Sequence, residues 1–87
     1  MISNSLRIEY LKLDAATPYQ NAPRVHNRAK RRKLRKLIER FGQVVPIIVD
    51  PEHVIIDGHA VHAVLREMGV EQIAVLVAPV VHSLRSL

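Results

Sequence analysis

Cysteine is absent from this 87-residue chain. Without a thiol the chain can form no disulfide, no thiolate metal site and no cysteine nucleophile. The N-terminus also lacks a basic segment followed by a long apolar one, so we infer no secretory signal. No apolar run approaches the roughly 18 residues that a membrane helix needs. Together these absences lead us to expect a soluble, cytoplasmic protein with no membrane partner.

Aromatic residues are scarce as well, because Tyr10, Tyr19 and Phe41 are the only three. The core must therefore be aliphatic. Proteins that bind single-stranded nucleic acid by base stacking usually show several exposed aromatics, so that mode of binding is disfavoured. The length allows one domain, residues 1–87, with a small core, and the abrupt end of the chain also fits a fragment of a longer protein.

Positive charge is abundant and unevenly placed. The net charge is +5, and nine of the thirteen Lys and Arg residues fall between Arg24 and Arg40, where Glu39 is the only acid. Such clustering favours a polyanionic partner, either DNA or a nucleotide. A solvated helix face that only keeps a small domain in solution would give the same pattern, and it is the alternative explanation.

Hydrophobic periodicity predicts an α+β domain with about four strands and two main helices. We expect strands at 6–13, 44–50, 54–57 and 72–77, helices at 28–41 and 59–68, and a loop at 14–27. The link between the second and third strands is too short for a parallel crossover, so they should form an antiparallel hairpin. Another helix could begin after Pro79.

The first helix is expected to be strongly amphipathic. Asn27 can cap its start and Gly42 can end it. Its buried stripe is predicted to consist of Leu34, Leu37, Ile38 and Phe41. Basic charge in its first turn opposes the helix dipole and so costs some stability. This cost favours a functional role for the charge. The basic residues that we predict to bind nucleic acid are Arg28, Lys30, Arg31, Arg32, Lys33, Arg35 and Lys36.

The turn Asp57-Gly58-His59 joins an apolar strand to the second helix. Backbone N–H groups and the positive end of a helix dipole meet there, so the turn can hold a phosphate, with Gly58 and His59 as contacts. A purely structural helix cap is the alternative. Catalysis by His59 with Asp57 is a weaker hypothesis, because no nucleophile or second carboxylate accompanies them. A metal site that adds His62 has no recognised spacing, so we predict no metal site and expect partly exposed, hydrogen-bonded histidines.

A proline-constrained loop precedes the first helix and holds Asn21, Arg24 and His26 close together. It can present an amide, a guanidinium and an imidazole in a fixed layout. An ordinary polar linker is the other interpretation.

In this order, the segments resemble the ParB-like N-terminal domain of the ParB/sulfiredoxin fold. The resemblance runs from the first strand to the last and depends on motifs at Asn21-Ala22-Pro23-Arg24, Phe41-Gly42, Pro46-Ile47-Ile48-Val49, Ile56-Asp57-Gly58-His59 and Met68-Gly69. It implies a small α+β domain whose site is formed by the Asn/Arg loop and the Gly-His turn. The phosphate or nucleotide contacts would then be Asn21, Arg24, Gly58 and His59.

The same resemblance implies a ligand class. In partition members of the family the site resembles a pocket for CTP with magnesium, so a nucleotide (CTP) with Mg²⁺ is the cofactor that the resemblance implies. Sulfiredoxin activity is excluded because it needs a cysteine. This chain also departs from the family at Val61, where a phosphate-binding Arg usually stands.

Our leading hypothesis is therefore a bacterial ParB-like, DNA-associated domain that binds nucleotide or nucleic-acid phosphate. Contact with DNA should be dominated by phosphate and sensitive to salt. The alternative is a nuclease or nucleotide hydrolase that uses His59 with Asp57 or Asn21, although binding is favoured over catalysis. A third hypothesis is a protein-interaction module, such as a homodimer formed through strand edges or the C-terminal tail.

Overall fold

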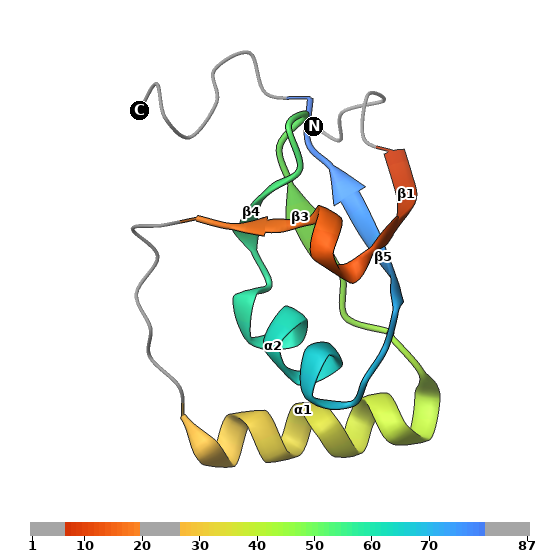
Figure 1. Cartoon of the computed structure of the whole chain (residues 1–87). Helices are drawn as coiled ribbons and strands as arrows, with labels where there is room; N and C mark the ends of the chain where they lie inside the picture. The colour runs from red at the N-terminus through yellow and green to blue at the C-terminus, as the bar shows by residue number, and fades with distance from the viewer. Residues whose placement is uncertain (1–6, 20–26, 80–87) are drawn as a thin grey trace, which may run out of the picture.

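A single mixed sheet with two α-helices makes up the computed structural model, which describes residues 7–19 and 27–79 (Figure 1). The strands are β1 (Arg7–Lys12), β2 (Thr17–Pro18), β3 (Ile47–Val49), β4 (Val54–Asp57) and β5 (Gln72–Val77). The helices are α1 (Arg28–Phe41), α2 (His59–Glu67) and a short 3₁₀ helix, η1 (Leu13–Ala15). The expected α+β class is confirmed, with five strands instead of about four.

The strands lie in the order β1-β5-β3-β4-β2. The β3–β4 pair is the antiparallel hairpin that the short connection predicted. Strand β5 runs parallel to β3 and antiparallel to β1, with Ile8 opposite Leu76. The predicted strands at 6–13, 54–57 and 72–77 and both main helices are thereby confirmed, while the helix suggested after Pro79 lies outside the described residues.

Strand β2 is the element that sequence reasoning missed. The stretch 14–27 was expected to be a loop throughout, but Thr17 and Pro18 pair in parallel with Val54 and Ile55 of β4. Two residues are too few to show alternation, and a proline is tolerated there because β2 is an edge strand. The pairing comes from tertiary contact and leaves no local signal.

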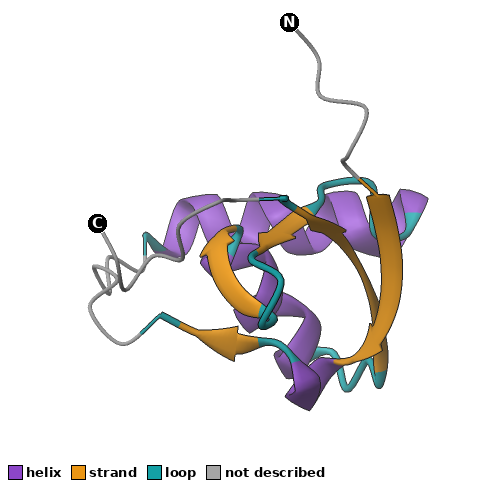
Figure 2. Ribbon diagram, turned by 90° about the horizontal axis from the view of Figure 1, so that it is seen from above, coloured by secondary structure: helices purple, strands orange, loops and turns teal. Residues whose placement is uncertain are grey.

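The core lies on the face of the sheet that α2 and η1 cover, and α1 packs against the outer side of α2 (Figures 1 and 2). It is aliphatic, as expected. Its buried apolar residues are Leu13, Ala16, Ile38, Ile47, Val49, Ile55, Val61, Val64, Leu65, Ile73, Val75 and Val77. None of the helices in the described part of the chain is long and apolar enough to cross a membrane.

The predicted buried stripe of α1 is wrong in its last turn. Ile38 is buried and Leu34 packs against the core, but Leu37 is 37% exposed and Phe41 is 60% exposed. The nine-residue α2 cannot cover the whole of the fourteen-residue α1, so the end of α1 extends past the core. Both ends of α1 are as expected, since Asn27 Oδ1 accepts the Lys30 N–H at 3.2 Å and Gly42 follows the last residue.

Strand β3 is shorter than the predicted 44–50. The Gln43 side chain makes the hydrogen bonds to β5 that the backbone of the first predicted residues would have made. The Gln43 side-chain amide donates to the Ala74 carbonyl at 2.8 Å and accepts the Ala74 N–H at 2.8 Å. A proline at position 46 has no N–H to give to a ladder. The Gln43 side chain therefore pairs with β5 where β3 has not yet begun.

Candidate functional site

The turn between β4 and α2 is built around Gly58. Its φ is +99°, in the left-handed region that side chains disfavour. A Cβ at this position would lie 3.0 Å from Ile47 Cα and 3.1 Å from the Pro46 carbonyl oxygen. Glycine is therefore needed both for the conformation and for the close approach, and it holds the start of α2 against the start of β3.

The backbone N–H groups at this turn are only partly free. The Gly58 N–H donates to Asp57 Oδ1 at 2.9 Å, and the His62 N–H donates to the Gly58 carbonyl at 2.9 Å. Gly58 is thus the N-cap, and it has no side chain to cap the helix. The N–H groups of residues 59–61 precede the first intrahelical bond and point out of the helix. No side chain caps them within residues 7–19 and 27–79, so these three amides, rather than that of Gly58, are the candidate donors to an anion.

His59 lies half-buried at this end of α2 and touches the end of β2. Its Nε2 accepts the Tyr19 N–H at 3.4 Å, so in the neutral ring the proton is on Nδ1. Burial lowers the pKa of His59 below 6.5, the Asp57 carboxylate partly offsets this, and His62 lowers it further. At neutral pH His59 is therefore uncharged and offers one N–H donor.

Asn21 and Arg24, the other two predicted phosphate contacts, lie outside the described residues. The residue before that segment is Tyr19, whose N–H rests on His59. The loop that carries both residues therefore begins beside the N-terminus of α2. Their role in binding remains a prediction.

His62 is a structural residue. The sequence suggested a partly exposed histidine, but His62 is 3% exposed and its Nε2 lies 3.0 Å from the Leu13 carbonyl oxygen of η1. This contact joins α2 to η1, which lies between β1 and β2 in the chain. Within 7–19 and 27–79, no three His, Cys, Asp or Glu side chains form a group that could hold a metal ion.

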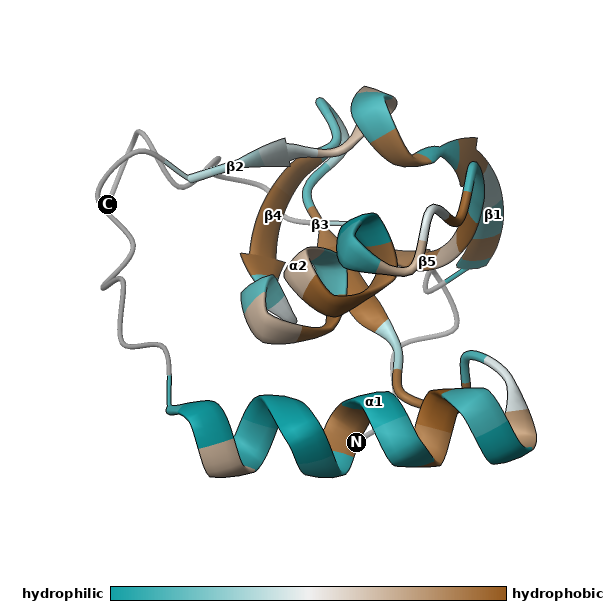
Figure 3. Ribbon diagram, turned by 60° about the horizontal axis from the view of Figure 1, so that its bottom comes forward, coloured by the Kyte–Doolittle hydropathy of each residue, from teal (hydrophilic) through white to brown (hydrophobic). Residues whose placement is uncertain are grey.

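The predicted nucleic-acid-binding face of α1 is mostly exposed. Figure 3 shows that hydrophilic residues make up most of this helix. Arg31 is the exception, because it is half-buried and pairs with Glu67 of α2. Arg35 is exposed but lies 3.5 Å from Glu39, one turn along the helix. A shallow hollow on the surface of α1 is lined by Asn27, Ala29, Lys30, Arg32, Lys33 and Lys36. The charge available to a ligand therefore lies mainly on these Lys and Arg residues and on Arg28.

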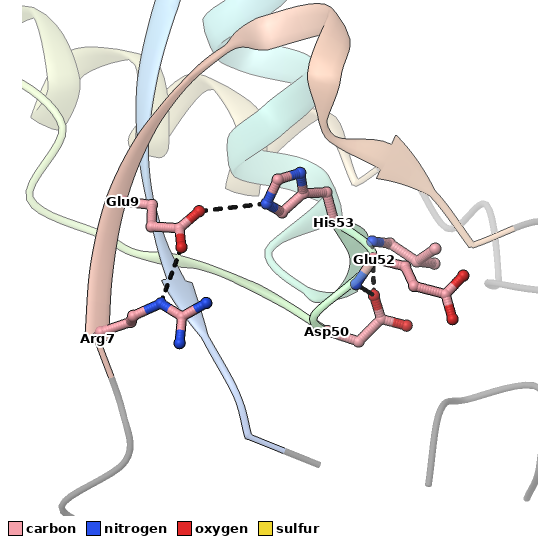
Figure 4. Close-up of polar contacts among 6 residues, drawn as sticks. Arg7, Glu9, Asp50, Glu52 and His53 are labelled. Atoms are coloured by element: carbon pink, nitrogen blue, oxygen red, sulfur yellow. Dashed lines mark hydrogen bonds and ion pairs between the residues drawn. The ribbon is translucent and has the colours of Figure 1, made fainter. Parts of the chain in front are cut away.

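Sequence reasoning missed Asp50, a carboxylate at the opposite end of β4 from the Gly-His turn. Asp50 is 1% exposed, and its Oδ1 accepts the N–H groups of Glu52 at 2.8 Å and Val54 at 2.9 Å (Figure 4). These bonds form the β3–β4 turn, and Oδ2 has no hydrogen-bond partner among the residues that the structure describes. The Asp-Pro pair was the available signal, because Asp side chains often bond to the backbone two residues on.

Comparison with known proteins places this fold. No family model matches the chain. The chain is 30% identical over 80 residues to the ParB-like nuclease domain-containing protein YnaK of Escherichia coli K12, covering 92% of this chain and 86% of that protein.

Two solved structures share the fold. A Pnob8-like ParB-N domain in its C2221 form has a TM-score of 0.72 at 21% identity, covering 88% of this chain and 31% of that one. The C-terminally truncated chromosome-partitioning protein ParB from Caulobacter crescentus, complexed with CTP-gamma-S, has a TM-score of 0.73 at 17% identity. That match covers 85% of this chain and 45% of the solved one. Because the curated relative matches nearly end to end and the folds agree, the chain belongs to the ParB-like domain family.

Proposed function

We propose that this ParB-like domain binds the phosphate groups of a nucleotide or of DNA at the N-terminal turn of α2. The observation that carries the proposal is the set of open N–H groups at 59–61, next to the donor Nδ1 of a half-buried, neutral His59. Helix N-termini with free amides favour anions through both hydrogen bonds and the helix dipole. The fold of the C. crescentus protein, solved with CTP-gamma-S, supports a nucleotide as one ligand.

Charge around the turn limits how tightly a phosphate is held. Val61 is 4% exposed and packs in the core, so this position supplies no guanidinium. Asp57 is exposed and places a carboxylate beside the same amides. Asp57 would be the residue that holds a Mg²⁺ ion accompanying a triphosphate, since Mg²⁺ commonly binds one or two carboxylates together with substrate phosphates. We therefore expect nucleotide binding to require magnesium and Arg24.

The exposed cations of α1 suit a DNA backbone. Each phosphate contact releases counterions, so log K for duplex DNA falls with log salt with a slope of about −0.9 per contact. Because Arg31 is committed to Glu67, it should contribute less than its neighbours Arg32 and Lys33. DNA binding should accordingly be weak in specificity and steep in its salt dependence.

Two titrations test this proposal: CTP with and without Mg²⁺, and a labelled DNA duplex followed by fluorescence anisotropy at two salt concentrations. The double variant Arg32→Ala/Lys33→Ala should weaken DNA binding and reduce the salt slope by up to about 2. Lys12→Ala is the matched control, because Lys12 is exposed on β1, away from α1. Failure to bind either ligand at low salt would refute the proposal.

Hydrolysis by the same site is the second candidate, since the curated relative carries the words nuclease domain in its name. His59 is neutral at neutral pH, as a general base requires, and Asp57 lies close enough to affect its pKa. However, its Nε2 lone pair is engaged with Tyr19, which favours a donor role over a base. DNA cleavage or phosphate release that is lost in His59→Ala but kept in Lys12→Ala would establish the enzyme.

A further inference from the structure

The two edges of the sheet are built very differently. Strand β2 is only two residues long and contains Pro18, two features that discourage pairing with another chain. Strand β1 is six residues long and contains no proline. Within the described part of the chain β1 pairs only with β5. The edge that β1 leaves open can therefore accept a further strand.

The hydrogen bonds between β1 and β5 determine which backbone groups face the open edge. Just past the end of β1, the Leu13 N–H donates to the Glu71 carbonyl at 2.8 Å. In an antiparallel pair every second residue makes such bonds, and the residues between them point their N–H and C=O groups the other way. The residues of β1 whose backbone groups face the open edge are therefore Ile8, Tyr10 and Lys12.

Gln43 provides independent evidence for this pattern. Ala74 of β5 lies opposite Tyr10 in the register. Both backbone groups of Ala74 bond to the Gln43 side chain, at 2.8 Å each, on the side of β5 that β3 occupies further along. They are directed away from Tyr10, so the N–H and C=O groups of Tyr10 are left for a strand on the open side.

The side chains at the same edge form an apolar surface. Ile8 is 63% exposed and Tyr10 is 70% exposed, and the alternation of a strand puts them on one face. Leu76 of β5 lies opposite Ile8. The surface continues into a shallow groove that Ile8 and Leu76 line together with Val44 and Pro46. Large apolar side chains gathered at an open edge are typical of an interaction surface.

The charge along β1 favours an acidic partner. The strand begins with Arg7 and ends with Lys12, and both are exposed. Its one carboxylate, Glu9, already contacts Arg7 at 2.8 Å and His53 at 3.2 Å (Figure 4). The whole chain carries a net charge of +5, so a second copy would bring like charge to this edge. A segment with an acidic residue at each end of the bound stretch complements β1 instead.

We propose that β1 binds an extended segment of another protein, which adds to this edge as an antiparallel strand. Apolar residues of the segment lie opposite Ile8 and Tyr10, and a neutral residue lies opposite Glu9. An acidic residue at each end lies opposite Arg7 or Lys12. Backbone hydrogen bonds supply affinity and the side chains supply specificity. The interface falls below about 1,200 Å², in the range of weak, transient complexes, and it does not depend on phosphate binding.

A synthetic peptide tests the proposal directly. The sequence Glu-Thr-Val-Thr-Val-Glu, blocked at both ends, is as long as β1 and sets its valines opposite Ile8 and Tyr10 when it runs antiparallel. Titrated into the isotope-labelled chain and followed by NMR, it should shift the amide resonances of β1 more than those of α1. Absence of binding would overturn the proposal. Self-association of the chain that excludes the peptide would also overturn it, because a second copy would then occupy the edge.

A matched peptide with lysine in place of both glutamates tests the role of charge. Two attractive pairs then become repulsive, so this peptide should bind about tenfold more weakly than the acidic one. Added salt should reduce the difference, because these charges are exposed to solvent. Equal affinities at low salt would overturn the assignment of an acidic partner.

N-methylated peptides test the strand geometry. In the proposed pairing the valine N–H groups donate to β1, and the threonine N–H groups point away from it. Methylation of both valine nitrogens should therefore weaken binding by about tenfold or more. Methylation of both threonine nitrogens should leave the affinity unchanged. Equal affinities of the two methylated peptides would mean that the segment does not bind as this strand, and would overturn the proposal.

Tyr10→Pro makes the same test from the side of the chain. Proline removes the N–H that faces the open edge and leaves the hydrogen bonds to β5 in place. Tyr10→Ala is the matched control, because it removes the same side chain and keeps the N–H. Tyr10→Pro should bind the acidic peptide about tenfold more weakly than Tyr10→Ala, with circular dichroism to verify that both variants fold. Equal binding by the two variants would contradict a backbone contact at this edge.

Discussion

Alanine in place of Gly58 would put a methyl group where the start of α2 meets the start of β3. The new Cβ would lie 3.0 Å from Ile47 Cα and 3.1 Å from the Pro46 carbonyl oxygen. Both are backbone atoms, so neither can rotate away, and α2 or β3 has to shift. Forced overpacking of this kind costs about 1–3 kcal/mol. The φ of +99° adds about 1–2 kcal/mol, because it is unfavourable for any residue with a side chain.

Gly69 offers a matched control within the same chain. Its φ is +74°, but, apart from Gly69 itself and its two chain neighbours, no residue in the described part of the chain has an atom within 4 Å of the Cβ that alanine would add. Gly69→Ala therefore measures the cost of the left-handed conformation alone, about 1–2 kcal/mol. Gly58→Ala should cost more by the overpacking contribution, about 1–3 kcal/mol.

Urea unfolding followed by circular dichroism measures both costs. The free energy of unfolding of a domain this size is about 4–13 kcal/mol, so Gly58→Ala removes a large share of it. In thermal unfolding each kcal/mol lowers Tm by about 4–8 °C. Equal losses in the two variants would refute the argument that the contact with β3 fixes the start of α2. Such a result would mean that only the conformation of the turn matters.

Three further predictions concern the histidines. Burial lowers the pKa of His59 below 6.5, so the unfolded chain binds the proton more readily than the folded chain. The free energy of unfolding should therefore fall as the pH drops through 6.5. Unfolding measured on either side of pH 6.5, with His59→Gln as the control, checks this. His53 has a φ of +67°, so His53→Gly should relieve about 1 kcal/mol of strain that His53→Ala keeps, as chemical denaturation of the two variants would reveal. His62→Leu should lose about 1 kcal/mol for the hydrogen bond to Leu13, and His62→Ala about 2–5 kcal/mol because it also opens a cavity; similar losses in both would contradict this account.

The candidate site could be predicted only where the chain itself brings residues together. Asp57, Gly58 and His59 are consecutive, so the strand–turn–helix geometry and the open helix end follow from the sequence. The hydrogen bond from Gly58 to Asp57 and the contact of His59 with Tyr19 could not be foreseen. The second contact joins residues forty positions apart, through a two-residue strand that has no periodicity to detect.

The charged face of α1 shows the same division. Composition and the 3.6-residue period place its Lys and Arg residues on the surface, and the structure agrees for all but one of the predicted set. Arg31 is removed from that face by Glu67, a residue of another helix. Its role depends on the packing of α1 against α2, which no pattern within either helix specifies.

By itself, the sequence determined the class of fold, the bounds of both helices and the hairpin. These follow from hydrophobic period, caps and the length of connections, which act over a few residues. The family was indicated by the resemblance of an ordered set of motifs, and the comparisons confirm it. Tertiary structure decided that β2 completes the sheet, that His62 and Asp50 are buried, and that Tyr10 and Phe41 lie outside the core. Those outcomes depend on which elements cover one another, and coverage is a property of the assembled domain that no short segment contains.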